Sequence, residues 1–181
     1  KALIISGPTA SGKTDLAYNI SGHVPAVILN ADSRHVFKEL NIIAGKDLPE
    51  EVTYIQSKTP VQSYFEHKNT ELYLFDIVGA EAEFSINDYV RSVNSVIDNL
   101  PTDKLLIFVG GSNFYISALT KNIETLHIPP NKALRMKLVK VELKVLHGML
   151  ESFVKFRLLK MIESDRKNPR RLILALVVAK S

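Results

Sequence analysis

Residues 2–14 read ALIISGPTASGKT, and this short stretch decides the fold. The apolar run at residues 2–5 is typical of a strand, and residues 15–20 resume with helical spacing. Between them, residues 7–14 match the pattern G-x-x-x-x-G-K-[S/T] at every defined position. Such a loop directs its backbone N–H groups and the N-terminus of the following helix at an anion. The stretch therefore predicts a strand, a phosphate-binding loop and a helix, and a plain glycine-containing turn is the alternative.

Every residue of this loop is a candidate ligand for a phosphate group. The candidates are Gly7, Pro8, Thr9, Ala10, Ser11, Gly12, Lys13 and Thr14. Among them, Lys13 supplies a positive charge to the terminal phosphate oxygens, and the Thr14 hydroxyl is a ligand for Mg²⁺.

Further apolar runs extend the strand–helix alternation along the chain. They are residues 26–29, 72–78 and 105–109, which we expect to be buried strands like the first. A helix separates the last two runs, because Ser85 and Asp88 form a capping-box pair ahead of apolar residues at helical spacing. Buried strands that alternate with helices predict an α/β fold with a parallel sheet covered on both faces.

The chain changes character after Pro130. Residues 1–130 carry a net charge of −5, whereas residues 131–181 carry +9. We expect residues 1–130 to form the phosphate-loop domain and residues 131–181 a basic helical segment that packs on it or completes it. Asn168 and Pro169 predict the start of the final helix. The basic segment indicates a polyanionic partner, and the solvated faces of amphipathic helices are an equally open interpretation.

Composition excludes several classes of function. The chain has no cysteine, so disulfides, thiol catalysis and cysteine-ligated zinc are ruled out, and its five histidines lack ligand spacing. No apolar run approaches the roughly 20 residues of a membrane span, and no secretory signal pattern follows Lys1. We expect a cytoplasmic protein that does not associate with membranes.

Polar residues at the ends of the predicted strands are the candidates for chemistry. Asp32 follows the second strand and stands where a ligand crevice opens at the carboxyl ends of parallel strands. Asp76 is either a metal-positioning acid or a buried structural one. His35 is a weaker candidate. Ser112 follows two glycines after the fourth strand, and it either donates into the crevice or caps the next helix.

Five blocks in this order resemble the tRNA dimethylallyltransferase (tRNA isopentenyltransferase) family. The blocks are GPTASGKT, NADSRHVFKELNI, LFDIVGAEAEFSINDYV, VGGSNFYISAL and SDRKNPRRLILAL. The resemblance implies a nucleotide-kinase-like fold and transfer of a prenyl group from dimethylallyl diphosphate to N6 of an adenine beside the tRNA anticodon. It implies that residues 7–14 hold the diphosphate rather than ATP.

The resemblance also implies roles for single residues. Asp32 is the general base on the adenine amine, and Lys13 and Mg²⁺ on Thr14 stabilise the leaving pyrophosphate. Ser112, which keeps the hydroxyl of the family's threonine, is a further catalytic candidate. The expected RNA contacts are Ser33, Arg34, His35, Phe37, Arg170 and Arg171. We expect a monomer that binds the anticodon stem-loop of tRNA.

The chain also departs from the family pattern. His35 and Phe37 stand where the family usually has Gln and Tyr, and residues 43–47 read IAGKD in place of Gly-Thr-Ala-Lys-Pro. Ser112 replaces a threonine, and residues 174–177 read LALV where the family has Arg-Ala-Leu-Glu. Family members also run well past residue 181, so we expect a fragment, a trimmed chain or a reduced member.

Three other functions remain open on the sequence. A small-molecule kinase would use ATP on the same loop, although no arginine-rich lid is visible between Gly45 and Thr70. A non-catalytic RNA-binding remnant would keep the fold and the basic helices. Prenylation of free AMP is a further option for the acceptor.

Overall fold

The fold was analysed in a computed structural model, which describes residues 1–38, 46, 48–49, 51–121, 123, 128 and 131–180, with the backbone alone at 155–157 and 160. The chain divides into two compact units, residues 1–122 and 123–181, which are described separately. Pro130 and most of the segment 43–47 lie outside the described residues.

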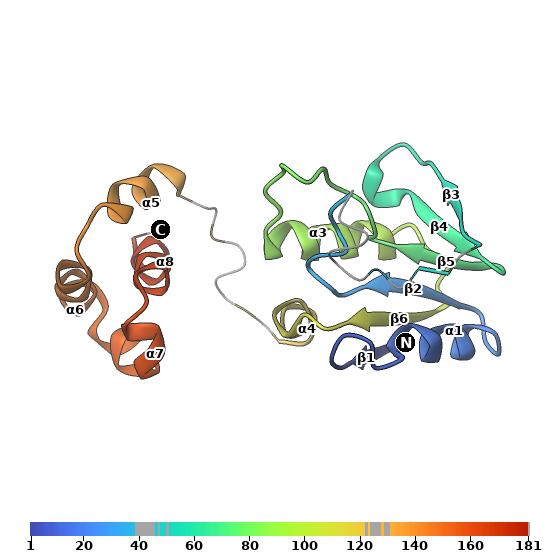
Figure 1. The fold of residues 1–181 in the computed structure, drawn as a ribbon, viewed down its shortest axis with the longest axis horizontal. Coiled ribbons are helices and arrows are strands. Elements are labelled where there is room, and N and C mark those ends of the chain that lie inside the picture. The colour runs from blue at the N-terminus through green and yellow to red at the C-terminus, as the bar shows by residue number, and fades with distance from the viewer. Residues whose placement is uncertain are drawn as a thin grey trace. The chain divides into compact units, whose positions relative to one another are not determined.

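The first unit is built on a six-stranded sheet with the order β1-β6-β2-β5-β4-β3 (Figure 1). Its strands are β1 (Ala2–Ser6), β2 (Ala26–Asn30), β3 (Thr53–Ile55), β4 (Tyr64–His67), β5 (Thr70–Tyr73) and β6 (Leu105–Gly110). β1, β6, β2 and β5 pair in parallel, as predicted, but β4 and β3 add an antiparallel extension. Sequence reasoning missed this extension. Lys68 and Asn69, both at positive φ, join β4 to β5 in a two-residue turn that reverses the chain.

Two of the predicted strands differ from the expectation. The run 72–78 leaves the sheet after Tyr73, because Leu74 and Asp76 adopt left-handed φ values of 67° and 54°. Its last residues instead follow the chain after β2, where the Ile77 N–H donates to the Val36 carbonyl at 2.9 Å. β1 is an edge strand, so Leu3 is exposed rather than fully buried.

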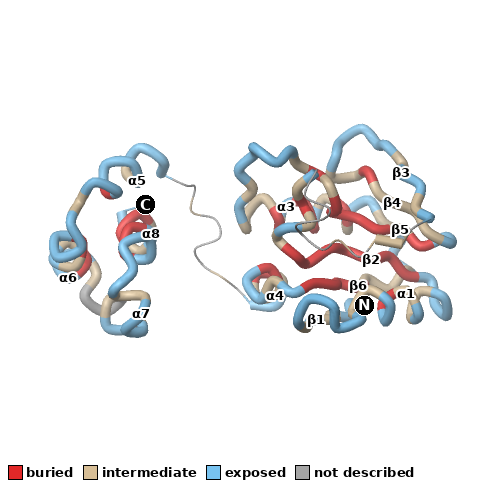
Figure 2. The backbone as a smooth tube through the Cα atoms, in the orientation of Figure 1, coloured by how far each residue is buried: buried red, intermediate tan, exposed pale blue. Residues whose placement is uncertain are grey.

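Helices cover both faces of the sheet, as expected. α1 (Lys13–Ser21) packs on one face against Ile28 and Ile107, and α3 (Ile86–Ile97) and α4 (Asn113–Thr120) cover the other. Successive residues of β2 alternate between these two cores, which makes the centre of the sheet fully buried (Figure 2). The capping box at the start of α3 is confirmed, since the Ser85 hydroxyl accepts from the Asp88 N–H. A 3₁₀ turn, η1 (Pro60–Gln62), precedes β4.

The second unit is helical throughout its described part. Its helices are α5 (Lys132–Val139), α6 (Leu143–Lys160), α7 (Glu163–Arg166) and α8 (Pro169–Ala179). Leucines of α5, α6 and α8 form its core, among them Leu138, Leu150 and Leu172. The start of α8 is as predicted, because the Asn168 side chain accepts from the Arg170 N–H ahead of Pro169.

Not every apolar side chain of α6 joins this core, since Val145 and Phe153 are exposed. A kink at Val154 (φ −150°, ψ 63°) turns the second half of α6, so the spacing cannot stay in phase across it. No helix within the described residues is long and apolar enough to cross a membrane.

Candidate active site

The loop at residues 7–12 joins β1 to α1 as the sequence predicts. Gly12 precedes the helix with a φ of 74°, a left-handed conformation that favours glycine. Gly12, the residue before α1, has no side chain that could cap the helix, so the N–H groups of the first turn are available to an anion. The Ser11 hydroxyl donates to the Pro8 carbonyl at 2.9 Å, and the Lys13 amine donates to the same oxygen. Lys13 therefore lies over the loop.

Asp32 follows β2 and is held by the last residue of that strand. The Asn30 side chain accepts from the Asp32 N–H at 2.8 Å and donates to the carbonyls of Asp32 and Leu74, both at 3.0 Å. Asp32 Oδ1 accepts from the Arg34 N–H at 3.0 Å and lies 3.6 Å from Arg34 Nε. No donor within the described residues reaches Oδ2. The turn thus holds one carboxylate oxygen and leaves the other without a donor among the described residues.

The end of β6 brings the loop and Asp32 together. A Cβ at Gly110 would lie 2.1 Å from the Ala31 carbonyl carbon, so only glycine fits at this crossing. A Cβ at Gly111 would lie 3.3 Å from the Gly7 carbonyl oxygen and 3.5 Å from Asp32 Oδ2. Gly111 therefore stands directly between the phosphate loop and the carboxylate.

A small cavity joins these groups. Its lining includes Thr9, Lys13 and Thr14 from the loop, and Asp32 and His35 from the segment after β2. Phe75, which follows β5, and Val109 and Gly110 at the end of β6 complete the lining. Segments that are distant in the chain thus form one cavity at the carboxyl ends of the parallel strands, where ligands bind in open α/β sheets.

Ser112 lies next to this cavity but does not line it within the described residues. It precedes α4, its N–H donates to the Ala31 carbonyl at 3.2 Å, and its side chain makes no capping hydrogen bond. The helix-cap interpretation is therefore not supported, and the hydroxyl remains available to a ligand.

Two stacked tyrosines support the site. Tyr89 and Tyr115 lie 3.8 Å apart at 14°, and the buried Tyr89 hydroxyl donates to the Asn30 carbonyl at 3.0 Å. Burial, followed by the negative charges of Asp32 and Asp88, raises the pKa of Tyr115 to about 12. Tyr115 is therefore a neutral phenol at physiological pH.

The residues after Asp32 are not all placed to meet RNA. The Arg34 side chain is exposed and Ser33 is half-buried, whereas His35 stacks on Phe75 at 6.0 Å. Phe37 packs against the core under α3, which favours a structural role for it.

The structure favours the structural interpretation of Asp76. Its carboxylate pairs with the Lys46 amine, which is buried and also donates to the Phe37 carbonyl at 2.7 Å. The pair ties the segment after β5 to the chain after β2. Sequence reasoning missed Lys46, and nothing in its immediate neighbours distinguishes it from a surface lysine.

The other predicted RNA contacts lie in the second unit. Arg170 and Arg171 are exposed in the first turn of α8, and Arg171 Nε lies 3.7 Å from Asp165 Oδ1. Together with Arg135 and Val139 of α5 they line a hollow of about 450 Å³. Arg135 was not predicted, because only the packing of α5 on α8 brings it near the arginine pair.

Asn30 was also missed, and Gly111 was noted only as one of the two glycines before Ser112. The sequence could have indicated Asn30, because a polar side chain at the end of a fully buried apolar strand needs hydrogen-bond partners. For Gly111 the sequence offered no signal beyond its place in a glycine pair.

Comparison with known proteins identifies related sequences. The model of a family described as "IPP transferase" matches residues 35–181. The tRNA dimethylallyltransferase of Bradyrhizobium sp. (strain ORS 278) is 31% identical over 156 residues, which is 83% of this chain and 45% of that protein. The tRNA dimethylallyltransferase 2 of Treponema denticola is 27% identical over 98% of this chain and 54% of its own length. The chain spans about half the length of the curated relatives it matches.

Solved structures show the same fold. A tRNA delta(2)-isopentenylpyrophosphate transferase from Staphylococcus epidermidis matches 97% of this chain and 53% of its own, with 25% identity and a TM-score of 0.54. A eukaryotic dimethylallyltransferase acting on tRNA matches 97% of this chain and 40% of its own with a TM-score of 0.70. At 19% identity the second likeness is evidence for the fold alone.

Proposed function

The chain belongs to the IPP transferase family, and from this premise we propose that it serves the transfer of a dimethylallyl group from dimethylallyl diphosphate to N6 of an adenine in tRNA. Pyrophosphate is the second product. Because the chain spans about half the length of its curated relatives, the proposal concerns the part of the reaction that residues 1–122 can perform.

The position of Gly111 carries this proposal. A Cβ at this position would lie 3.3 Å from the Gly7 carbonyl oxygen and 3.5 Å from Asp32 Oδ2. The space that its missing side chain leaves therefore adjoins both the phosphate loop and the carboxylate. A diphosphate on residues 7–14 therefore lies beside a carboxylate with one oxygen free. A nucleophile that approaches the carbon next to the diphosphate has a proton acceptor within reach.

The chemistry follows from these positions. The N6 amine attacks the allylic carbon, a C–N bond forms, and the C–O bond breaks with its electron pair leaving on pyrophosphate. The N6 proton passes to Asp32 Oδ2. The loop N–H groups, the Lys13 amine and the Ser112 hydroxyl stabilise the charge on the leaving group.

The residues present fit a bound Mg²⁺. This ion binds proteins through one or two oxygen ligands and takes its others from phosphates and water. Thr14 lines the same cavity as Asp32, and we propose its hydroxyl as the protein ligand beside the diphosphate. When bound, Mg²⁺ neutralises charge on the leaving pyrophosphate.

The acceptor is proposed to be the anticodon stem-loop of tRNA. Support comes from the +9 charge of residues 131–181, the exposed Arg170 and Arg171, and the exposed Arg34 beside Asp32. A tRNA acceptor implies action in the cytoplasm. A monomer remains a prediction, which the molecular mass in solution tests.

One assay tests the proposal against its alternatives. The protein is incubated with Mg²⁺, labelled dimethylallyl diphosphate, and either bulk tRNA or AMP. Transfer of label to tRNA that is lost when Lys13 is replaced supports the proposal. Transfer of label to AMP would identify a free nucleotide, and not tRNA, as the acceptor. Binding of tRNA without transfer supports the non-catalytic remnant. Turnover of ATP to ADP without prenyl transfer would refute it in favour of a kinase.

A further inference from the structure

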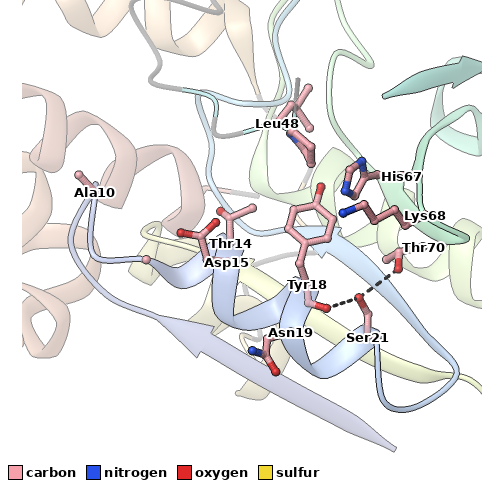
Figure 3. A pocket seen from close by; sticks show the side chains of 13 residues that line it. Ala10, Thr14, Asp15, Tyr18, Asn19, Ser21, Leu48, His67, Lys68 and Thr70 are labelled. Atoms are coloured by element: carbon pink, nitrogen blue, oxygen red, sulfur yellow. Dashed lines mark hydrogen bonds between the residues drawn. The ribbon is translucent and has the colours of Figure 1, made fainter. Parts of the chain in front are cut away.

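Two hollows larger than the cavity beside Asp32 lie elsewhere in the protein. The first, of about 730 Å³, runs along α1 to the β4–β5 turn, where the Thr70 hydroxyl donates to the Ser21 hydroxyl at 3.0 Å (Figure 3). Ala10 and Thr14 of the phosphate loop line it, so it continues the proposed phosphate site. The second is the hollow of about 450 Å³ that α5 and α8 line, called the α5–α8 hollow below. Its lining belongs entirely to the helical unit, so it is a separate surface.

Both helices line the α5–α8 hollow with the same pattern of residues. α5 contributes Arg135 and, one turn later, Val139, while α8 contributes Arg170 and, one turn later, Leu174. Val139 is 66% exposed and Leu174 is 41% exposed, although both side chains are apolar. The rest of the described lining consists of Arg171 and the buried Ile173. The hollow thus combines three arginines with exposed apolar side chains.

The protein does little to neutralise these arginines. Arg170 and Arg171 lie in the first turn of α8, which contains no acidic residue and where the helix dipole is already positive. Of the three arginines, Arg171 alone has an ion-pair partner among the described residues, Asp165 at 3.7 Å. No acidic residue belongs to the described lining. The arginines therefore place repelling charges at the start of a helix, and an anionic partner would relieve that repulsion.

The apolar side chains of the α5–α8 hollow indicate which kind of anion fits. RNA phosphates need only cations, and proteins that hold an unstacked base usually stack it on an aromatic ring. None of the lining residues that the structure describes is aromatic. Exposed apolar side chains beside charges of one sign instead match a helix with an apolar face flanked by carboxylates. Leu174 also stands where the family pattern has arginine, so this apolar character is a departure of this chain.

We propose that the α5–α8 hollow docks an acidic amphipathic helix of a partner protein. The apolar face of that helix covers Val139 and Leu174, and its carboxylates pair with the arginines on either side. Because Arg170 and Arg171 are also the proposed tRNA contacts, the docked helix competes with tRNA. That competition rests on the proposed tRNA binding, whereas the docking itself does not.

Fluorescence anisotropy with the whole chain tests the proposal. The probe is a labelled peptide of about fifteen residues, with leucine at every third or fourth position and glutamate on the other faces. We expect it to bind more tightly than a scrambled peptide of the same composition, because only the first peptide gathers its leucines on one face. Leu174→Arg and Val139→Arg should each weaken binding about tenfold, the effect of one lost apolar contact, although each adds a positive charge.

Val145→Arg is the matched control, because Val145 is an exposed residue of α6 outside the hollow. It should not weaken the peptide, and melting curves should confirm that the variants fold. Val139→Arg keeps the test decisive if Leu174→Arg unfolds, since Val139 is the more exposed of the two.

Equal affinity for the two peptides would overturn the proposal. So would a folded arginine variant of the hollow that binds the peptide as tightly as the unaltered chain, because the attraction would then be one of charge alone. A loss of tRNA affinity in Leu174→Arg without a loss of peptide affinity would overturn it in favour of RNA. Simultaneous binding of peptide and tRNA would overturn only the competition.

Discussion

The substitution Asp32→Asn separates the chemical role of this carboxylate from its structural one. Asparagine keeps the volume of the side chain and an oxygen at the position of Oδ1, which accepts from the Arg34 N–H at 3.0 Å. It removes the negative charge and replaces Oδ2 by an amide NH₂ group, which cannot accept the proton of the N6 amine. Alanine would be a blunter test, because Asp32 is only 8% exposed and its truncation would also leave the Arg34 N–H without its acceptor.

The expected effects on stability and on rate differ widely in size. The change weakens one charge-assisted hydrogen bond and an exposed ion pair with Arg34, which together stabilise the fold by about 1 kcal/mol. For a unit of this size that corresponds to a fall in Tm of about 4 °C. Loss of a general base lowers the rate by a factor of about 10² to 10⁴. Pyrophosphate affinity should change little, because the loop is intact.

Single-turnover prenyl transfer to tRNA, calorimetry with pyrophosphate and thermal melting provide the three measurements. Asn30→Ala is the matched structural control, since it removes three buried hydrogen bonds worth about 3 kcal/mol in total without touching the carboxylate. It should lower the Tm far more than Asp32→Asn does. Near-normal transfer by Asp32→Asn, or a loss of rate only in step with unfolding, would refute the assignment of Asp32 as the base.

Three further predictions concern the loop, the basic unit and α3. Lys13→Ala should lower both pyrophosphate affinity and transfer rate, as measured by calorimetry and single turnover, and an unchanged affinity would contradict its place over the loop. Replacing Arg170 and Arg171 together by alanine should flatten the slope of log tRNA affinity against log salt by about 1 to 2, and an unchanged slope would identify them as a solvated helix face. Ser85→Ala should lower the free energy of unfolding by about 1 kcal/mol at neutral pH, because it removes the cap of α3. The hydrogen bond from the Ser85 hydroxyl to the Asp88 carboxylate is the main cause that lowers the pKa of Asp88, so this part of the contribution is complete above the ordinary value of 3.8 and is lost as acid protonates the carboxyl. Denaturation across that range should show the difference between the two proteins shrink at low pH to the part contributed by the Asp88 N–H bond, and a constant difference would count against the linkage.

The sequence alone predicted the features that depend on interactions within a few residues. The phosphate loop, the capping box at Ser85 and the start of α8 at Asn168 each depend on groups within one helical turn, so neighbouring residues specify them. The buried strands β2 and β6 were predicted for a similar reason, because a strand covered on both faces is apolar throughout.

Tertiary structure decided everything that depends on partners distant in the chain. The strand β5 ends at Tyr73 because the following residues pair with the segment after β2, and no local signal marks that competition. The Lys46 amine is buried where Asp76 and the Phe37 carbonyl accept its hydrogen bonds, and neither is its neighbour in the chain. Gly111 meets Asp32 because two parallel strands end side by side. The local sequence therefore specifies the phosphate loop of the site. The register of the sheet brings the Asp32 carboxylate to that loop, because hydrogen bonding between strands, and not local propensity, sets which strand ends lie side by side.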